Sequence, residues 1–387
     1  MSWKGKYLMC GRAAFLKAFE KGDDSMANLC RQLNISRKTG YHWLALLREE
    51  GEAVALNGKS RAPLNHPNAT SCEMESAIIA VRQERPSWGP KKIAVVLART
   101  WSADMIPSVS TIGDILKRNG LVIPRKIRQR SSPSSEPLVH ATDCNVVWCV
   151  DFKGWFRTRD GHRIDPLTVT DAHSRYLLCC QGLCGKTNGI HVQAIFETIF
   201  RVYGLPERIR TDNGSPFAST GLAGLSRLAA WWIRLGIVPE RIKPATPSEN
   251  GRHERFHLTL KQETASPPAS TPRKQQESFD RFRQCYNNER PHEALGQVTP
   301  VTYYTPSPRA YPVRLAPIEY GDDMIVRRVR GTGGDMKWGG KNIHVTPALS
   351  GEPIGLLPVD DGIWQVYFCS VPLGIFDERQ LRIKRIK

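Results

Sequence analysis

The sequence is poor in acidic residues: among its 387 residues, 37 Asp and Glu stand against 55 Lys and Arg, which gives a formal net charge of +18. A basic excess of this size favours a polyanionic partner, above all nucleic acid, because binding releases condensed counterions. The sequence also lacks any apolar run near the roughly 20 residues of a membrane-spanning helix. The first residues have no apolar segment typical of a secretory signal, and no lipidation motif is present. We therefore expect a cytoplasmic protein with no membrane partner.

Cysteine pairs at metal-binding or redox spacing are missing as well. The ten cysteines include no C-x-x-C pair, and those close in sequence, such as Cys179 and Cys180, fall in apolar, strand-like stretches. In this compartment, buried reduced thiols are favoured over disulfides or a structural zinc site. A chain of this length is expected to fold into roughly two to four domains.

Residues 1–57 are predicted to form a helix-turn-helix DNA-binding domain. Residues 11–50 carry apolar side chains at helical spacing, Asn34 tolerates the left-handed conformation of a tight turn, and Ser36 can cap the helix that follows. The first exposed turns of that helix carry the candidate DNA-contacting residues Arg37, Lys38, Tyr41 and His42. Gly40 departs from the helix-turn-helix pattern, in which an apolar residue usually packs at this position, so an ordinary helical hairpin stays the alternative.

A Pro-, Gly- and Asn-rich connector separates this domain from a second helical, winged-helix-like DNA-binding domain over residues 69–124. The segment PSVSTIGDILKRNGL is predicted to hold its recognition helix, with the candidate DNA-contacting residues Ser108, Ser110, Thr111 and Lys117. Residues 125–138 combine basic residues with Ser and Pro, which predicts a linker that crosses the phosphate backbone. The basic residues of this linker are Arg125, Lys126 and Arg128. Two helical units in tandem would contact a longer DNA site than one.

The pattern changes from helical to strand-like at Val146, where VVWCVDFKGWF is predicted to be a buried strand. Asp151 interrupts its apolar run, and a carboxylate inside a core strand is costly unless it is paired or bound to a cation. Two more strands, a helix over residues 187–203 and a short strand over residues 207–211 follow, which predicts a mixed sheet with helices on its faces. The short strand delivers Asp212 into the loop TDNGSPF, near the strand ends where ligands gather in such sheets.

Another acid, Glu254, lies on a helix predicted to start near Asn250. The residues predicted to share one face of this helix are Asn250, Glu254, His257 and Lys261, at steps of four, three and four residues. Two potential cations near Glu254 would hold its carboxylate ionised and aimed. Alternatively, this face is an exposed surface cluster without a chemical role.

Three carboxylates from a first strand, a fourth strand and a later helix do not converge without a counter-charge, because like charges repel. Divalent metal supplies that charge, and hard oxygen ligands with open coordination positions suit Mg²⁺ or Mn²⁺. Two such ions stabilise the attacking and the leaving oxygen of an in-line phosphoryl displacement. Since the net charge already indicates a nucleic-acid partner, these acids predict cleavage and joining of DNA phosphodiesters. The sequence shows no convincing Ser, Tyr or His nucleophile constellation for a covalent intermediate.

Four motifs in order, WCVDFKG, RTDNGSPF, PATPSENGRHERFHLTLK and YNNERPHEALGQVTP, resemble the DDE transposase and retroviral-integrase superfamily, particularly bacterial insertion-sequence transposases. The resemblance implies a ribonuclease H-like integrase catalytic core, which we assign to residues 139–306, with Asp151, Asp212 and Glu254 as the catalytic and metal-binding residues. Glu249 is a rival third acid, but Glu254 matches the family position that precedes an aromatic residue and a basic turn. The interval from Asp212 to Glu254 is 42 residues (254 minus 212), longer than in compact members, and the Trp-rich segment 221–235 accounts for the excess.

The resemblance implies a metal-dependent DNA transposase that cleaves the 3′ end of an insertion sequence and transfers the freed strand into target DNA. Mg²⁺ or Mn²⁺ would be the cofactor, with two ions per active site. The partners would be double-stranded DNA, as element terminal repeats and as target, and further copies of the chain in a synaptic homo-oligomer associated with the bacterial nucleoid. Arg252, Arg255 and Lys261 would grip the DNA end beside the metal ions. A DNA-binding transcriptional regulator with an inactive core, or a structure-selective nuclease, are the alternatives.

Residues 313–387 are again strand and turn, with a hairpin expected at Asp360-Asp361-Gly362. This part is predicted to be a small β-barrel, similar to the SH3-like C-terminal domains of the superfamily. Its final segment, RQLRIKRIK, is a basic strip for which DNA contact and subunit docking are both open. The expected fold is thus multidomain: N-terminal all-α helix-turn-helix units, a central α/β ribonuclease H-like mixed sheet and a C-terminal small barrel. Asp171 is predicted to serve a turn rather than a metal, and Arg290, Pro291 and His292 to have structural roles.

Overall fold

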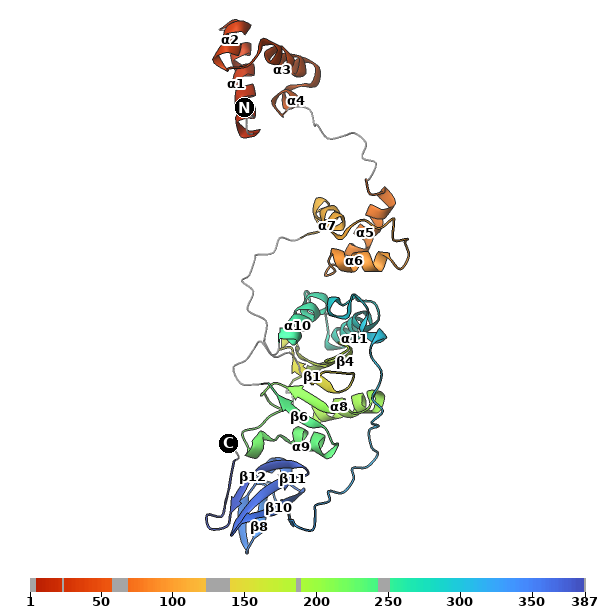
Figure 1. Cartoon of the computed structure of the whole chain (residues 1–387), viewed down its shortest axis with the longest axis vertical. Coiled ribbons are helices and arrows are strands. Elements are labelled where there is room, and N and C mark those ends of the chain that lie inside the picture. Colours follow the sequence, from red (N-terminus) through yellow and green to blue (C-terminus); the bar gives the residue numbers. More distant parts are fainter. Residues whose placement is uncertain are drawn as a thin grey trace. The chain divides into compact units, whose positions relative to one another are not determined.

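The structure is a computed structural model that describes residues 5–22, 24–57, 69–122, 140–185, 189–242 and 251–385, without the side chains of residues 5–10 and 251–253. It divides into two compact units, Met1–Thr70 and Ser71–Lys387, whose elements are labelled in Figure 1. Several predicted site residues lie outside the described part: Arg125, Lys126, Arg128, Glu249 and the side chain of Arg252.

The first unit contains the predicted helix-turn-helix arrangement. Its helices are α1 (Gly5–Lys21), α2 (Met26–Gln32), α3 (Arg37–Glu50) and α4 (Glu52–Asn57). Asn34 takes the predicted left-handed conformation, with φ of 52°, and the Ser36 hydroxyl accepts a hydrogen bond of 3.1 Å from the backbone N–H of Thr39. Both local predictions are confirmed, because a short polar side chain satisfies turn and cap geometry without help from the rest of the fold.

The glycine that departs from the helix-turn-helix pattern, Gly40, has a packing reason. It is buried in α3, where an added Cβ would lie 2.9 Å from Cys30 Sγ, 3.0 Å from Phe15 Cζ and 3.1 Å from Met26 Sδ. Neighbouring side chains fill the space that an apolar residue takes in the expected pattern. The departure therefore does not argue against a helix-turn-helix.

The second unit begins with three helices, α5 (Cys72–Glu84), α6 (Pro90–Leu97) and α7 (Val109–Arg118). They pack around Met74, Ile78, Ile93 and Ile112, all at most 1% exposed. Residues 69–122 contain no strand that would form a wing. The Ser108 hydroxyl caps α7 through the backbone N–H of Thr111.

The central sheet is mixed. Its strands are β1 (Val147–Phe152), β2 (Phe156–Arg157), β3 (Arg163–Asp171), β4 (Leu177–Cys184), β5 (Arg208–Thr211) and β6 (Val238–Arg241). β3 pairs antiparallel with β4 on one edge and with β1 and β2 on the other, while β1 pairs parallel with β5 and β5 parallel with β6. The sequence did not predict β6.

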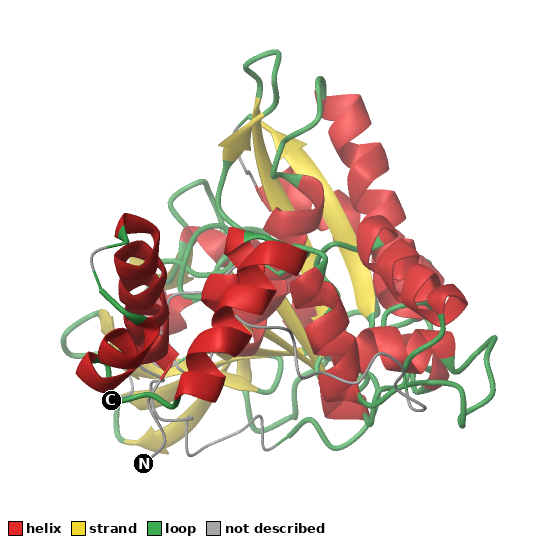
Figure 2. Ribbon diagram, turned by 90° about the horizontal axis from the view of Figure 1, so that it is seen from above, coloured by secondary structure: helices red, strands yellow, loops and turns green. Residues whose placement is uncertain are grey.

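Helices cover both faces of this sheet (Figures 1 and 2). On one face, α8 (Gly189–Tyr203) and α9 (Arg227–Arg234) pack with Trp148, Val150, Leu167 and Ile209. On the other face, α10 (Gly251–Thr264) and the unpredicted α11 (Pro272–Asn288) pack with Ile164, Leu177 and Cys180. The expected α/β layering is present, and it determines on which face each strand residue lies.

The C-terminal part is an antiparallel sheet with an added hairpin. Its strands are β7 (Ile325–Arg328), β8 (Asp335–Trp338), β9 (Lys341–His344), β10 (Pro353–Asp360), β11 (Ile363–Phe368), β12 (Val371–Asp377) and β13 (Arg382–Lys384). The order β13-β12-β11-β10-β7 is an open path in the described residues, and β8 pairs with β9 alone. The hairpin at Asp360-Asp361-Gly362 is confirmed, whereas closure into a barrel is not.

Two findings concern features that the sequence lacks. No helix in the described ranges is long and apolar enough to cross a membrane. None of the nine cysteines whose side chains the structure describes forms a disulfide; Cys179 and Cys180 are buried, but Cys72 and Cys184 are exposed, contrary to the expectation of burial. Burial raises the pKa of the Cys179 thiol to about 12, which keeps it protonated.

Gly40→Ala tests the packing of α3. Ala normally stabilises a helix by up to about 1 kcal/mol relative to Gly, but here its Cβ would overpack Cys30 and Phe15. We expect the free energy of unfolding of the first unit to fall by about 1–2 kcal/mol, measured from the hydrogen-exchange protection of α1–α3 amides in the full chain. Gly113→Ala, in α7, is the matched control, because the nearest atom to its Cβ is Pro90 Cγ at 3.6 Å. It should leave the free energy of unfolding of its own helices, read from the α5–α7 amides, unchanged or raise it. Equal effects of the two changes would contradict this account.

Candidate active site

The two predicted strand acids lie at the same level on neighbouring parallel strands. β1 and β5 pair from Val147 with Arg208 to Cys149 with Arg210. Two residues further along both strands come Asp151, still within β1, and Asp212, directly after β5. Neighbouring strands are about 4.8 Å apart, so this pairing brings the backbones of the two acids to the same region of the sheet although 61 residues (212 minus 151) separate them in sequence.

Both acids lie on the face of the sheet that α10 covers. Trp148 and Val150 belong to the apolar cluster beneath α8, and side chains alternate along a strand, so Asp151 points to the opposite face. The cross-strand partner of Asp151 on β3 is Thr168. Thr168 and Ile164 are an even number of residues apart on β3, so their side chains lie on the same face of the sheet. Ile164 packs in the cluster that contains Phe256 and Leu260 of α10. Thr168 and Asp151 therefore lie on the face that α10 covers.

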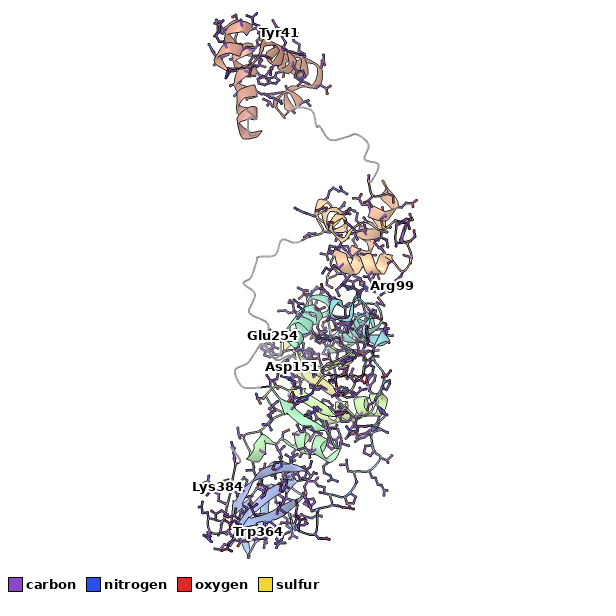
Figure 3. The ribbon with its side chains drawn as sticks, viewed as in Figure 1. Tyr41, Arg99, Asp151, Glu254, Trp364 and Lys384 are labelled. Carbon is purple, nitrogen blue, oxygen red and sulfur yellow. The ribbon has the colours of Figure 1, made fainter. Side chains whose placement is uncertain are left out.

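A hydrogen-bonded chain joins α10 to the strand of Asp151. The buried Thr168 hydroxyl donates to the backbone carbonyl of Asp151 at 3.1 Å, and Thr168 Oγ1 lies 3.0 Å from His257 Nε2. Since a hydroxyl has one proton to donate, His257 must donate from Nε2. Glu254, which lies one turn before His257 on the same helix face, is exposed; it and Asp151 are labelled in Figure 3.

The turn after β5 holds the side chain of Asp212. The backbone N–H of Gly214 donates to Asp212 Oδ1 at 3.1 Å, and Asn213 Nδ2 donates to the carbonyl of Ile242 at 2.9 Å. A Cβ on Gly214 would lie 3.0 Å from Asp212 Oδ2. A larger side chain at this position would therefore crowd the Asp212 carboxylate.

Cations flank the acids on the same face. Lys153 follows Asp151 by two residues, and its pKa is lowered by burial and then by the positive charge of Lys261 on α10. Arg255 and Lys261 are exposed. Sequence reasoning assigned Lys261 and Arg255 to DNA and placed His257 beside Glu254, but it missed Lys153 and Thr168 as parts of the site. A lysine two residues after a strand acid was the available signal for Lys153.

The described residues contain no group of three or more His, Cys, Asp or Glu side chains arranged to hold a metal ion. The pair Asp151 and Asp212 nevertheless offers hard oxygen donors on one face, which is the donor type that Mg²⁺ and Mn²⁺ prefer. Glu254 stands in the first turn of α10, directly after the undescribed residues 243–250. That the Glu254 carboxylate joins Asp151 and Asp212 stays a prediction.

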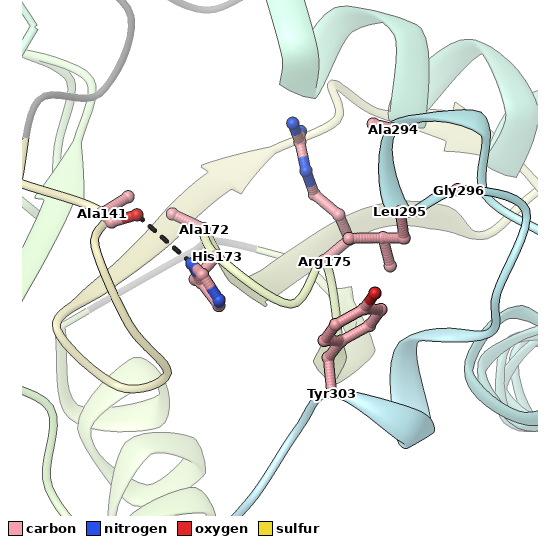
Figure 4. A pocket seen from close by; sticks show the side chains of 8 residues that line it. All are labelled: Ala141, Ala172, His173, Arg175, Ala294, Leu295, Gly296 and Tyr303. Atoms are coloured by element: carbon pink, nitrogen blue, oxygen red, sulfur yellow. Dashed lines mark hydrogen bonds between the residues drawn. The ribbon is translucent and has the colours of Figure 1, made fainter.

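Asp171 belongs to the other end of the sheet and serves a turn, as expected. Its oxygens accept from the backbone N–H groups of Asn145 and Ser174 and from the Ser174 hydroxyl. The turn that follows lines an open hollow of about 490 Å³ (Figure 4). Asp171 pairs with Trp148 whereas Asp151 pairs with Thr168, so this hollow is separate from the acid pair.

The candidate DNA-contacting residues of both recognition helices lie at the surface. The exposed ones are Arg37, Lys38, Tyr41, His42, Ser108, Ser110 and Lys117, while Thr111 is half-buried. The Ser108 hydroxyl caps α7 and lies 2.8 and 2.9 Å from the hydroxyls of Ser110 and Thr111, respectively. Its cap role therefore competes with a role in DNA contact.

These features define a class of protein: a mixed-sheet core with two acids at the ends of its central parallel strands, preceded by helical units with exposed recognition helices. Models of the integrase core domain match this chain over residues 141–247 and 235–300. A helix-turn-helix domain model matches residues 12–63, and a homeodomain-like domain model matches residues 39–116. The chain thus resembles members of the superfamily of DDE transposases and retroviral integrases, with an integrase core domain preceded by helix-turn-helix domains.

Individual relatives agree with this assignment. An uncharacterized 31.7 kDa protein of insertion element IS407 from Burkholderia multivorans is 24% identical over 259 residues, which cover 65% of this chain and 88% of that protein. An uncharacterized 39.2 kDa protein of insertion element IS476 from Xanthomonas euvesicatoria is 25% identical over 262 residues, 66% of this chain and 72% of that protein.

Solved structures were also found to be similar. The HTLV-2 integrase catalytic core domain in complex with magnesium is 14% identical, with a TM-score of 0.30, over 42% of this chain and 99% of that chain. A chain of the simian T-cell lymphotropic virus intasome in complex with PP2A regulatory subunit B56 gamma is 15% identical, with a TM-score of 0.34, over 76% and 97% of the respective chains.

Thr168→Val tests the link between α10 and β1. The change keeps the side-chain volume but removes the hydroxyl that joins His257 to the Asp151 carbonyl, so the free energy of unfolding should fall by about 1–3 kcal/mol. In a double-mutant cycle with His257→Leu, chemical denaturation should give a coupling of about 1 kcal/mol.

The matched control is Thr259→Val, because the Thr259 hydroxyl bonds only within α10, to the Arg255 carbonyl at 3.2 Å. It should change stability by less than about 0.5 kcal/mol. A strictly additive cycle would show that the Thr168 to His257 contact does not hold α10 in place.

Proposed function

We propose that this protein is a metal-dependent DNA transposase that cleaves the 3′ end of an insertion sequence and joins it to target DNA. One observation carries the proposal above all: Asp151 and Asp212 lie level on adjacent parallel strands, on the face that α10 covers. Two carboxylates placed side by side repel each other and need a cation between them. The family matches and the insertion-element relatives support the same conclusion.

Asp151, Asp212 and Glu254 would hold Mg²⁺ or Mn²⁺, two ions in the complete site. The residues fit this role because all three supply carboxylate oxygens, and because Gly214 orients Asp212 through its backbone N–H. When bound, the ions supply charge stabilisation for the entering and leaving oxygens of a phosphoryl displacement. Glu254 is preferred over Glu249 because His257, one turn further on, contacts the cross-strand partner of Asp151.

The chain's own cations would position the DNA. Lys153 and Lys261 lie close enough for their charges to interact, and the exposed Arg255 of α10 would add a further cation, as would Arg252. Phosphate contacts of this kind set the register of the strand without selecting a base sequence. First water would attack the phosphodiester at the element end and release a 3′-hydroxyl. That hydroxyl would then attack a target phosphodiester, so that one P–O bond breaks as another forms.

Sequence recognition would come from the helical units. Helix α3 would present Arg37, Lys38, Tyr41 and His42, and α7 would present Ser110, Thr111 and Lys117, to the terminal repeat of the element. Arg125, Lys126 and Arg128, in the linker after α7, would contact the phosphate backbone. Paired element ends require more than one copy of the chain, so we propose a homo-oligomer. The ribonuclease H-like class of the core and an SH3-like class for the C-terminal sheet belong to the same proposal.

Asp212→Asn separates the proposal from a DNA-binding regulator. The change removes one negative charge and one metal ligand, so cleavage and joining of labelled end DNA to plasmid in Mn²⁺ should fall about a hundredfold or more, while affinity for end DNA stays within about twofold. Asp322→Asn, at an exposed position in the C-terminal part, is the control and should leave joining unchanged.

The same assay identifies the other alternative. Cleaved but never joined products from the parent protein would mean a structure-selective nuclease. Full activity in the Asp212→Asn variant would remove Asp212 from the site and with it this proposal.

A further inference from the structure

The helices α5, α6 and α7, which we call the second helical unit, are in contact with the core at the end of α11. The contacts come from α5, α6 and the turns after them, and they meet α10 and the segment from Cys285 to Glu293. This segment contains the motif NNERPHE, to which the sequence assigned only a structural role. Cys285 packs against the apolar cluster that contains Trp88, so the junction has an apolar part as well as a polar one.

Two ion pairs lie at the edge of the junction, and in both the helical unit supplies the cation and the core supplies the carboxylate. Arg85 Nη2 is 2.6 Å from Glu289 Oε2, and Lys91 Nζ is 2.6 Å from Glu293 Oε1. Arg99 adds a hydrogen bond of 2.9 Å to the carbonyl of Glu289. Three cations of the helical unit thus contact carboxylates and a carbonyl of the core, while Lys91 and Arg99 remain exposed to solvent.

A more buried group links the junction to the helix that carries Glu254. Glu263, on α10, accepts from Arg290 Nη1 at 2.5 Å and from the Ser87 hydroxyl, and Arg290 Nη1 lies 3.3 Å from Ser87 Oγ. Arg290 is 8% exposed. Lys92 donates to the Pro291 carbonyl, and burial, followed by the charge of Arg290, lowers its pKa to about 8. Contacts of this kind hold α10 in one position relative to the helical unit.

The recognition helix of this unit faces away from the junction. In the part of the chain that the structure describes, the contacts with the core that we identify come from α5, α6 and the turns that follow them. Ser110 and Lys117 of α7 are exposed. The unit can therefore contact DNA through α7 while it remains attached to the core through α6.

We propose that the second helical unit stays docked on the core when it binds DNA, so that the junction fixes the distance between the base pairs that α7 contacts and the phosphodiester that is cleaved. The inference rests on the proposed function. It assigns Arg85, Lys91 and Lys92 to docking rather than to DNA phosphates. It also makes Glu263, Arg290 and Ser87 positioning residues, because they link the docked unit to α10.

A charge swap tests the docking. The first variant, Arg85→Glu with Lys91→Glu, reverses the cations, the second, Glu289→Arg with Glu293→Lys, reverses the acids, and the third combines all four changes. These side chains are partly exposed, and such ion pairs contribute little to folding. Arg273→Glu with Arg281→Glu changes the charge by the same amount as the first variant, at exposed positions of α11 outside the junction, and is the control.

The full chain is incubated with labelled end DNA and Mn²⁺, and the cleaved phosphodiester is mapped to the nucleotide at saturating DNA. We expect each reversal to lower cleavage at the parental position by about tenfold or more and to spread the cuts over neighbouring positions. The combined variant should restore both position and rate to within about threefold. The α11 control should cleave at the parental position.

Three results would overturn the inference: parental cleavage in both reversals, faster cleavage in the acid reversal, which would make the junction inhibitory, or a combined variant no better than its parts. If the parent protein binds end DNA but neither cleaves nor joins it, the proposed function itself fails. If the parent cleaves and the reversals do not change the cut position, only the docking inference fails.

Discussion

The active site depends on the register of one parallel pairing, β1 with β5. A slip of one residue would turn the Asp212 side chain toward the apolar face where Phe196 and Trp232 are buried. The register is held from that apolar face, where Trp148 and Ile209 are fully buried and directly paired. In the proposed site, hydrophobic packing beneath α8 would therefore keep the two carboxylates together beneath α10, and a bound cation would offset their repulsion.

The Trp-rich segment that lengthens the interval between the second and third acids joins two parts of the molecule. Leu228 and Trp232 of α9 pack in the core of the central sheet, while Ala229 and Ile233 of the same helix pack in the core of the C-terminal sheet. Arg234 Nη1 lies 2.6 Å from Glu352 Oε2 across the same contact. Helix α9 is thus shared between two hydrophobic cores, which explains why this insertion is apolar on two sides. It attaches the C-terminal sheet directly to the catalytic core.

Local features of the chain were predictable, and features that depend on distant contacts were not. The run of β-branched and aromatic residues from Val146 located β1 and made Asp151 conspicuous, and the Asn34 turn and the Ser36 cap followed from side-chain chemistry alone. Helix α11 was missed although Thr271 caps it and Phe279, Phe282 and Tyr286 recur at helical spacing, so that signal was available. By contrast, the Thr168 contact with His257 joins residues 89 apart. The reason for Gly40 lies in three side chains of other helices, which no local pattern contains.

The most direct test of the central claim is the location of bound metal. Anomalous diffraction from crystals of the protein in Mn²⁺, with a DNA end bound, would locate the ions independently of activity. We expect Mn²⁺ within about 2.1 Å of carboxylate oxygens of both Asp151 and Asp212, with the carboxylate of Glu254 completing the site from α10. Mn²⁺ bound elsewhere, or a Glu254 carboxylate directed away from the other two acids with no other acid in its place, would contradict the account.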